Sequence, residues 1–361
     1  MNKRFAVEGV DAQTPLAEAA PALLRAKAKP LFALEDAARG GADMDAVHDM
    51  RVASRRLREA MRLFEPLYPP AEFKSWYRNI RSITRALGPV RDSDVFIDAF
   101  AGLAPVLGGD GRRFAAFLLG YRTAQREREL EELNRQLGAL ELDESRQAFK
   151  KLVRRLADPA GARRPIGEFA YSEVAERAAK VFAAQREALD EAAVTAQHEL
   201  RIHYKRLRYA VEAFAPCYGE RFDPLHTTLT AFQDTLGELH DEHVFLEMVR
   251  SPERAGAAGR AGIPADGIAE VDRALAVRAH ETFVRFTWLA EGHSPERLLP
   301  ELLLPLVVPE DAESPAPAAA PPEAPAAAVP VRPERRPAEI VLPADTAARP
   351  EVALVVKFLD E

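Results

Sequence analysis

The amino-acid sequence predicts an all-α protein: two pseudosymmetric helical bundles that arise from an internal duplication, followed by a disordered Pro/Ala-rich C-terminal tail. Three observations lead to this prediction. Apolar residues recur at steps of three and four up to about residue 292, as on the buried face of a helix. No alternating run of β-branched residues competes with that period. Segments 46–68 and 196–218 resemble each other over their whole length.

The duplication includes charged positions as well as apolar ones. At an offset of 150 residues, the aligned pairs are His48 with His198, Arg51 with Arg201, Arg55 with Lys205, Arg58 with Arg208, and Phe64 with Phe214. Towards the N-terminus, Lys27 aligns with Arg177 at the same offset. Towards the C-terminus, after a one-residue deletion, segment 86–96 aligns with 235–245. Apolar matches alone would maintain a fold, so the repeated cations indicate a shared surface.

The apolar period and the breaks between periodic segments predict where each helix lies. We expect helices over 15–38, 43–65, 70–87, 91–106, 111–137, 143–157, 168–192, 195–214, 221–237, 240–251 and 265–291. Gly88-Pro89 is expected to end a helix, because proline does not continue one. Asp92 and Asp241 would then lie in the first turn of the helices that follow. Segment 251–267, rich in Gly and Ala, is expected to be a flexible loop.

Composition divides the chain into four parts. We expect an N-terminal extension over 1–14, a first helical bundle over 15–150 and a second over 151–292. Residues 293–361 are rich in Pro, Ala and acid and bury too little apolar surface to order themselves. This tail ends in the short apolar segment EVALVVKFLDE, for which three alternatives are open: a docking segment for partner proteins, a return onto the bundle, or a frayed terminus.

The charge is unevenly distributed along the chain. The net charge is −7, and residues 309–361 contribute −5 of it through five Lys/Arg and ten Asp/Glu. In contrast, segments 46–62 and 196–208 each carry +3, and segment 74–91 carries +5. Local potential, and not total charge, decides what a groove attracts. One cysteine, no apolar run long enough for a signal peptide and none of about 18 residues for a membrane span favour a cytoplasmic location.

The first repeated helix places its cations in one line. At about 100° per residue, five side chains fall on one narrow face about 20 Å long: His48, Arg51, Arg55, Arg58 and Arg62. Such cations repel one another unless anions lie between them, so a long polyanion would stabilise the arrangement. Guanidinium groups suit phosphate in particular. The alternative is a solvated face whose cations pair with neighbouring carboxylates such as Glu59 and Glu212.

The two motifs VHDMRVASRRLR and QHELRIHYKRLR, each followed by LGxxxD, resemble the CHAD family, the histidine-bearing α-helical domain. The resemblance covers residues 15–292. It implies two pseudosymmetric four-helix bundles, a basic central channel that binds inorganic polyphosphate, and association with polyphosphate granules. It assigns binding to His48, Arg51, Arg55, Arg58, His198, Arg201, Lys205 and Arg208, with Lys27, Arg62, Arg91, Arg177 and His240 as neighbours. Because no triphosphate-tunnel domain precedes residue 15, triphosphatase activity is not implied.

Two other classes of function stay open. His48-Asp49 and His240-Asp241 resemble the metal-binding pair of helical phosphohydrolases, but Arg91 aligns with His240, and arginine does not replace a metal-binding imidazole. Nucleic-acid binding is the other alternative, which the scarcity of aromatic residues near the cations disfavours. We therefore expect a non-enzymatic protein with no catalytic residue, metal ligand or cofactor.

Overall fold

The computed structural model describes residues 5–40, 44–138, 142–156 and 161–307. Within these ranges the regular secondary structure is helical, apart from one isolated β-bridge between Pro15 and Pro165. The predicted all-α class is confirmed.

The longer helices carry the fold, and within the described ranges four short 3₁₀ turns lie between them. The α-helices are α1 (Leu16–Ala33), α2 (Glu35–Gly40), α3 (Met44–Phe64), α4 (Pro70–Leu103), α5 (Gly109–Gly138), α6 (Leu142–Leu152), α7 (Ile166–Ala188), α8 (Val194–Ala213), α9 (Ala215–Tyr218), α10 (Phe222–Arg250), α11 (Pro252–Arg260), α12 (Ala265–Gly292) and α13 (Pro295–Val307). The 3₁₀ turns are Glu65–Leu67, Ala104–Val106, Gly161–Arg163 and Gly219–Arg221.

Two expected helix breaks are absent from the described residues. Helix α4 continues through Gly88-Pro89, and α10 continues through residues 238–239. Pro89 removes one backbone donor, but Leu87 and Val90 on either side of it are buried, so tertiary packing holds the helix together. The expectation that Asp92 and Asp241 lie in first turns was therefore wrong, because both lie well inside long helices.

Two segments outside the expected helices are also helical. Residues 252–260, expected to be a loop, form α11, and the Ser251 Oγ accepts a hydrogen bond from the backbone N–H of Arg254 at its start. Residues 295–307, expected to belong to the tail, form α13, which buries Leu298, Leu302 and Leu306 against the rest of the protein. The predicted disorder of residues 308–361 and their apolar end lie outside the described residues.

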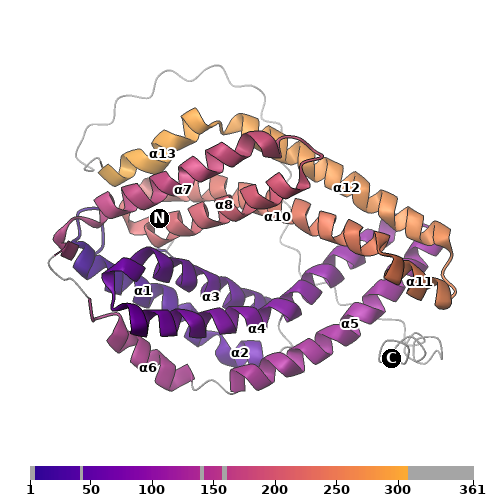
Figure 1. Cartoon of the computed structure of the whole chain (residues 1–361), viewed down its shortest axis with the longest axis horizontal. Helices are drawn as coiled ribbons and strands as arrows, with labels where there is room; N and C mark the ends of the chain where they lie inside the picture. Colours follow the sequence, from indigo (N-terminus) through magenta and orange to yellow (C-terminus); the bar gives the residue numbers. More distant parts are fainter. Residues whose placement is uncertain (1–4, 41–43, 139–141, 157–160, 308–361) are drawn as a thin grey trace. The chain divides into compact units, whose positions relative to one another are not determined.

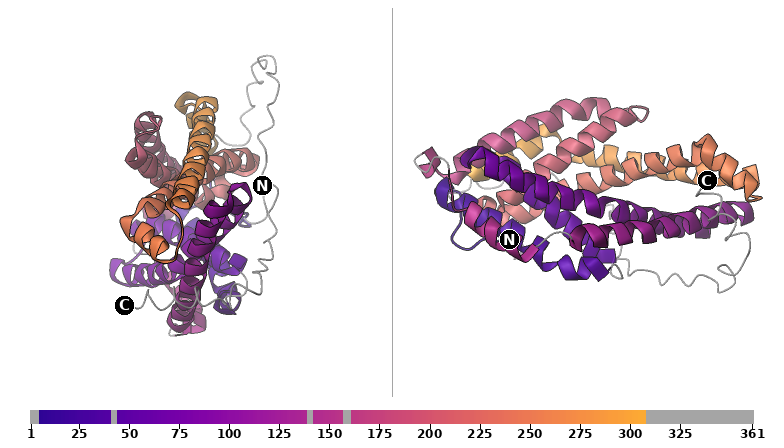
Figure 2. Two further views of the ribbon diagram at one scale, coloured as in Figure 1. Left: turned by 90° about the vertical axis from the view of Figure 1, so that its right-hand side faces the viewer. Right: turned by 60° about the horizontal axis from the view of Figure 1, so that its bottom comes forward.

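The helices pack in the same order in both halves. In the first half, α1 contacts α3, α3 contacts α4, and α4 contacts α5. In the second half, α7 contacts α8, α8 contacts α10, and α10 contacts α12 (Figure 1). These described helices belong to one compact unit. The two halves are joined by contacts between equivalent helices, α3 with α8 and α5 with α12 (Figure 2).

Equivalent residues meet where the two halves begin. The backbone N–H of Leu16 donates to the carbonyl of Arg164, and that of Ile166 donates to the carbonyl of Thr14, each at 2.9 Å. Leu16 and Ile166 are 150 positions apart, and so are Thr14 and Arg164. Reciprocal contacts of this kind are what a twofold axis produces. The internal duplication as the origin of this arrangement stays a prediction.

Helix α3 separates an apolar face from a polar one, and this positions the site. Val47, Met50, Leu57 and Met61 are fully buried in the shared core. The opposite face of α3 carries the cations and lies beside α4 and α8. Burial of the apolar face therefore orients the basic face towards the second half of the protein.

Candidate functional site

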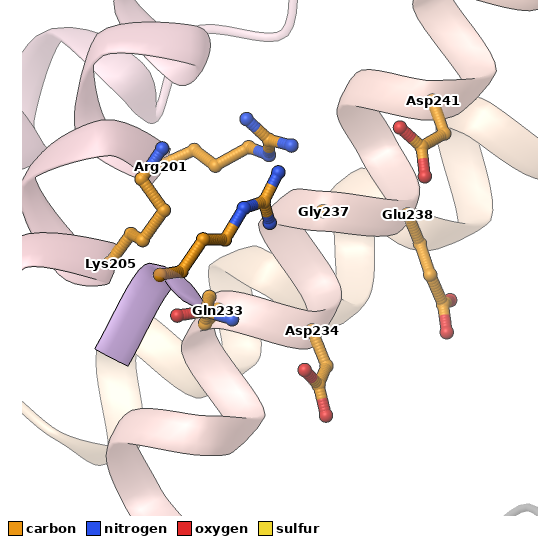
Figure 3. A pocket seen from close by; sticks show the side chains of 8 residues that line it. Arg201, Lys205, Gln233, Asp234, Gly237, Glu238 and Asp241 are labelled. Atoms are coloured by element: carbon orange, nitrogen blue, oxygen red, sulfur yellow. The ribbon is translucent and has the colours of Figure 1, made fainter. Parts of the chain in front are cut away.

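Cations from both halves line one pocket in the centre of the protein. Arg55 comes from α3, and Arg201 and Lys205 come from α8. The pocket has a volume of about 300 Å³ and is completed by residues of α10, namely Gln233, Asp234, Gly237, Glu238 and Asp241. In Figure 3 the Arg201 side chain extends towards α10. The two repeated helices thus bring their cations together.

The cations in this group act on one another through their charges. Burial, and after it the charge of Arg55, lowers the pKa of Arg51 to about 10. Burial, followed by the charges of Arg55 and Arg201, lowers the pKa of Lys205 to about 8. Burial also lowers the pKa of Arg201. Because crowding disfavours the charged forms, a bound anion would be stabilised here and would relieve the repulsion.

Arg51 lies at the edge of this group, against α4. One guanidinium nitrogen is 3.4 Å from Asp92 Oδ1. A Cβ on Gly88 would lie only 2.9 Å from the Arg51 Nη1 atom, so glycine makes room for the guanidinium beside α4. Gly88 and Asp92 belong to the first copy of the LGxxxD motif, which lies beside Arg51 and does not end a helix.

Burial and neighbouring cations lower the pKa of three histidines, His48, His198 and His240. Burial, and then the charge of Arg91, lowers the pKa of His48. His198 and His240 face each other with their Nδ1 atoms 3.1 Å apart. Burial, followed by the charges of Arg201 and His198, lowers the pKa of His240 to about 4. At neutral pH these imidazoles therefore offer hydrogen bonds and not charge.

Carboxylates of α10 form the opposite wall of the pocket. Asp234, Glu238 and Asp241 follow one another along α10 in Figure 3. Burial raises the pKa of Asp241 to about 6. Glu238 is paired with Arg285 of α12, at 2.6 Å. Sequence reasoning did not assign these carboxylates to the site. Their spacing of three and four residues was the available signal.

Arg208 lies in a buried ionic network and not in the pocket. Its side chain is only 8% exposed, and its guanidinium donates to Glu212 at 2.8 Å and to Gln233 at 2.7 Å. Glu212, fully buried, also accepts from Arg56 at 2.6 Å and lies 2.9 Å from the Nε2 atom of His226. Because the Arg208 guanidinium is buried and already paired, the structure does not support the prediction that Arg208 contacts the ligand.

The remaining predicted residues lie around the group. Lys27 donates to the backbone carbonyl of Glu212 at 2.7 Å, and Arg177 pairs with Glu173 of its own helix at 2.7 Å. Arg58 and Arg62 lie over the ring of Tyr77, at 5.7 and 5.5 Å from its centroid. Arg62 also pairs with Glu59. For this residue the structure agrees with the alternative in which the cations of α3 pair with neighbouring carboxylates.

Two properties of the described residues bear on the other classes of function. No three His, Cys, Asp or Glu side chains gather there in a way that would hold a metal ion. None of the described helices combines the length and the apolar character needed to cross a bilayer.

The fold and site define a helical protein in which cations from two similar halves line one pocket. The chain belongs to the CHAD domain family, whose model matches residues 16–250. That family is associated with polyphosphate.

Two solved structures have a similar fold. The CHAD domain from the plant Ricinus communis has a TM-score of 0.60 at 22% identity, over 80% of this chain and 95% of that one. PptA from Streptomyces chartreusis has a TM-score of 0.56 at 17% identity, over 79% of this chain and 99% of that one. Among curated proteins, no match was found.

Proposed function

We propose that this protein binds inorganic polyphosphate in the central pocket, that it does so without catalysing a reaction, and that it acts in the cytoplasm at polyphosphate granules. The observation that carries the proposal is the convergence of Arg55, Arg201 and Lys205 from two helices of different halves. Family membership supports the same ligand class. Partner proteins of the granule would contact the C-terminal tail.

The chemistry of the pocket favours a flexible phosphate chain over a single small anion. Besides burial, the charge of nearby Arg55 lowers the pKa of Arg51, yet Arg51 does not line the pocket, so the cations extend past the pocket itself. A ligand with successive phosphates would contact the cations of both halves at once, and arginine offers forked donors to each phosphate. The affinity should fall steeply with salt, because each phosphate contact releases counterions.

The direct test is a titration with polyphosphates of graded length at several salt concentrations. A variant with Arg51, Arg55, Arg201 and Lys205 all replaced by Gln should lose most of its affinity while keeping its helical content. The matched control replaces four exposed cations elsewhere, Arg112, Arg186, Arg260 and Arg273, by Gln. Equal binding by both variants would overturn the assignment of the pocket.

The absence of catalysis and the choice of ligand are tested in the same preparation. Incubation with polyphosphate and added divalent metal should release no phosphate; sustained release would favour the phosphohydrolase alternative. Long polyphosphate should displace RNA and DNA from the protein. Displacement of polyphosphate by nucleic acid at lower concentration would favour a nucleic-acid-binding protein instead.

A further inference from the structure

Three arginines of α4 form an exposed row outside the pocket. Arg78, Arg81 and Arg85 are separated by three and four residues, so they share one face of the helix. All three are exposed. Within the described ranges, none of them has an ion pair or side-chain hydrogen bond with another residue. Three such cations on one face repel one another, which costs stability unless an anion binds.

One end of this row lies close to the cations in and beside the pocket. Asp92 lies seven residues after Arg85, on the same face of α4, and pairs with Arg51. One end of the row is therefore fixed beside the pocket. At 1.5 Å per residue, Arg78 lies about 21 Å from Asp92 along the helix.

A second row of arginines, Arg55, Arg58 and Arg62, lies on the neighbouring helix α3 and is called the α3 row; the first is called the α4 row. The Arg58 Nη2 atom lies 3.4 Å from the Tyr77 hydroxyl, and Arg62 lies over the same ring. Because Tyr77 is next to Arg78 in sequence, these contacts align the outer end of the α3 row with the outer end of the α4 row. Figure 1 shows α3 and α4 side by side. Together the rows make a basic strip on the first half, which comprises Arg55, Arg58, Arg62, Arg78, Arg81 and Arg85.

The second half lacks this strip at the equivalent positions. With the one-residue deletion, buried Ile80, Ile83 and Leu87 of α4 correspond to buried Leu229, Phe232 and Leu236 of α10, which confirms the register. In that register Arg78, Arg81 and Arg85 correspond to Thr227, Thr230 and Asp234. The α4 row is thus replaced by two hydroxyls and a carboxylate.

Arg58 and Arg62 of α3 also lose their counterparts in the second half, where the equivalent positions on α8 carry no free positive charge. Arg58 corresponds to Arg208, which is buried against Glu212, and Arg62 corresponds to Glu212 itself. Tyr77 corresponds to His226, which contacts the same carboxylate at 2.9 Å. A polyanion that leaves the pocket over the first half meets six arginines, of which Arg62 is paired with Glu59. One that leaves over the second half meets Asp234 and Glu238.

We propose that polyphosphate is bound asymmetrically: the chain extends from the central pocket along the basic strip of α3 and α4, and the acidic wall of α10 excludes it from the second half. This inference rests on the proposed function. It predicts that long chains bind more tightly than short ones because of three side chains outside the pocket.

The test compares tripolyphosphate with a long-chain polyphosphate on the full-length protein. The variant R78Q/R81Q/R85Q should lose about tenfold or more in affinity for the long chain and less than twofold for tripolyphosphate. Its salt dependence for the long chain should become shallower by about one unit of slope for each phosphate that the variant no longer neutralises. The variant R112Q/R186Q/R273Q removes the same charge elsewhere and should bind both ligands as the wild type does.

A gain-of-function variant tests the acidic wall. Replacing Thr227, Thr230 and Asp234 by Arg recreates the row on α10 and should raise affinity for the long chain by several fold. Unchanged long-chain binding by R78Q/R81Q/R85Q, or equal losses for both ligands, would overturn the asymmetric path while leaving the pocket intact. If the wild type binds neither ligand, the proposed function fails, and the asymmetric path fails with it.

Discussion

Phe64 and Phe214, 150 positions apart in the chain, meet edge to face in the core with their ring centroids 5.9 Å apart. Phe64 is the last residue of α3, and Phe214 directly follows the last residue of α8. The contact therefore joins α3 to α8 through equivalent residues. Because this contact holds the ends of the two helices together, Arg55 of α3 and Arg201 and Lys205 of α8 lie close enough to line one pocket.

Replacing Gly88 by Ala should weaken binding without destabilising the fold. The new Cβ would lie 2.9 Å from the Arg51 Nη1 atom, so the guanidinium must move away from α4. We expect a several-fold loss of affinity for polyphosphate and an unfolding free energy that is equal or higher by up to about 1 kcal/mol, since alanine favours a helix interior. Titration and chemical denaturation measure the two quantities.

Gly120→Ala, in the interior of α5, is the matched control for this change, because a Cβ there would meet no atom within 4 Å outside its own stretch of helix. It should gain similar stability and leave the position of Arg51 unchanged. Wild-type affinity in Gly88→Ala would show that the placement of Arg51 does not matter for binding.

Affinity for polyphosphate should decrease as the pH rises from 5 to 9. Burial raises the pKa of Asp241 to about 6, so a negative charge appears beside the pocket above that pH. Burial and neighbouring cations lower the pKa of Lys205 to about 8, so a positive charge is lost above that pH. Both changes disfavour an anion, and titrations at constant ionic strength measure them.

Two variants separate the contributions. Lys205→Arg should remove the decrease near pH 8, because arginine stays charged throughout this range. Asp241→Asn should remove the decrease near pH 6. An affinity that rises with pH in the wild type would contradict both assignments.

Replacing Glu212 by Gln should destabilise the protein by about 3 kcal/mol, because it leaves Arg56 and Arg208 buried without their carboxylate. Burial alone would raise the pKa of Glu212, but His226, Arg56 and Arg208 outweigh it and hold that pKa well below its usual range. A carboxylate with a lowered folded pKa stabilises the fold above about pH 4.3 and loses that contribution as pH falls. Denaturation at pH 7 and pH 3 should show a smaller difference for Glu212→Gln than for the wild type.

Helix α13 should contribute to stability although it lies beyond the residues matched by the family model. Leu302 is fully buried, and its carbonyl accepts a hydrogen bond from Tyr218 at 3.0 Å. Leu302→Ala should lower the unfolding free energy by about 2–4 kcal/mol. Leu304→Ala, on the same helix but 53% exposed, should change it by less than about 0.5 kcal/mol. Equal effects of the two substitutions would contradict the packing of α13.

Some features of the site follow from local sequence alone. The spacing of apolar residues predicts helices, and the same spacing places Arg51, Arg55 and Arg58 on one face, because 3.6 residues per turn decides both. The repeat predicts a second such face with Arg201 and Lys205. These properties depend on residues within a few turns of one another, so they can be predicted before any fold is known.

The tertiary structure decided which of these cations are free to bind. Arg208 has the same spacing as Arg201 and Lys205, yet it is buried against Glu212, which also binds Arg56 from a helix 156 residues away in the chain. Helix α4 continues through Pro89 because buried neighbours hold it. Pairing and burial depend on contacts between distant segments, and helical period carries no information about those contacts. For that reason the sequence determined the helices and their basic faces, and the packing of α3 against α8 determined the pocket.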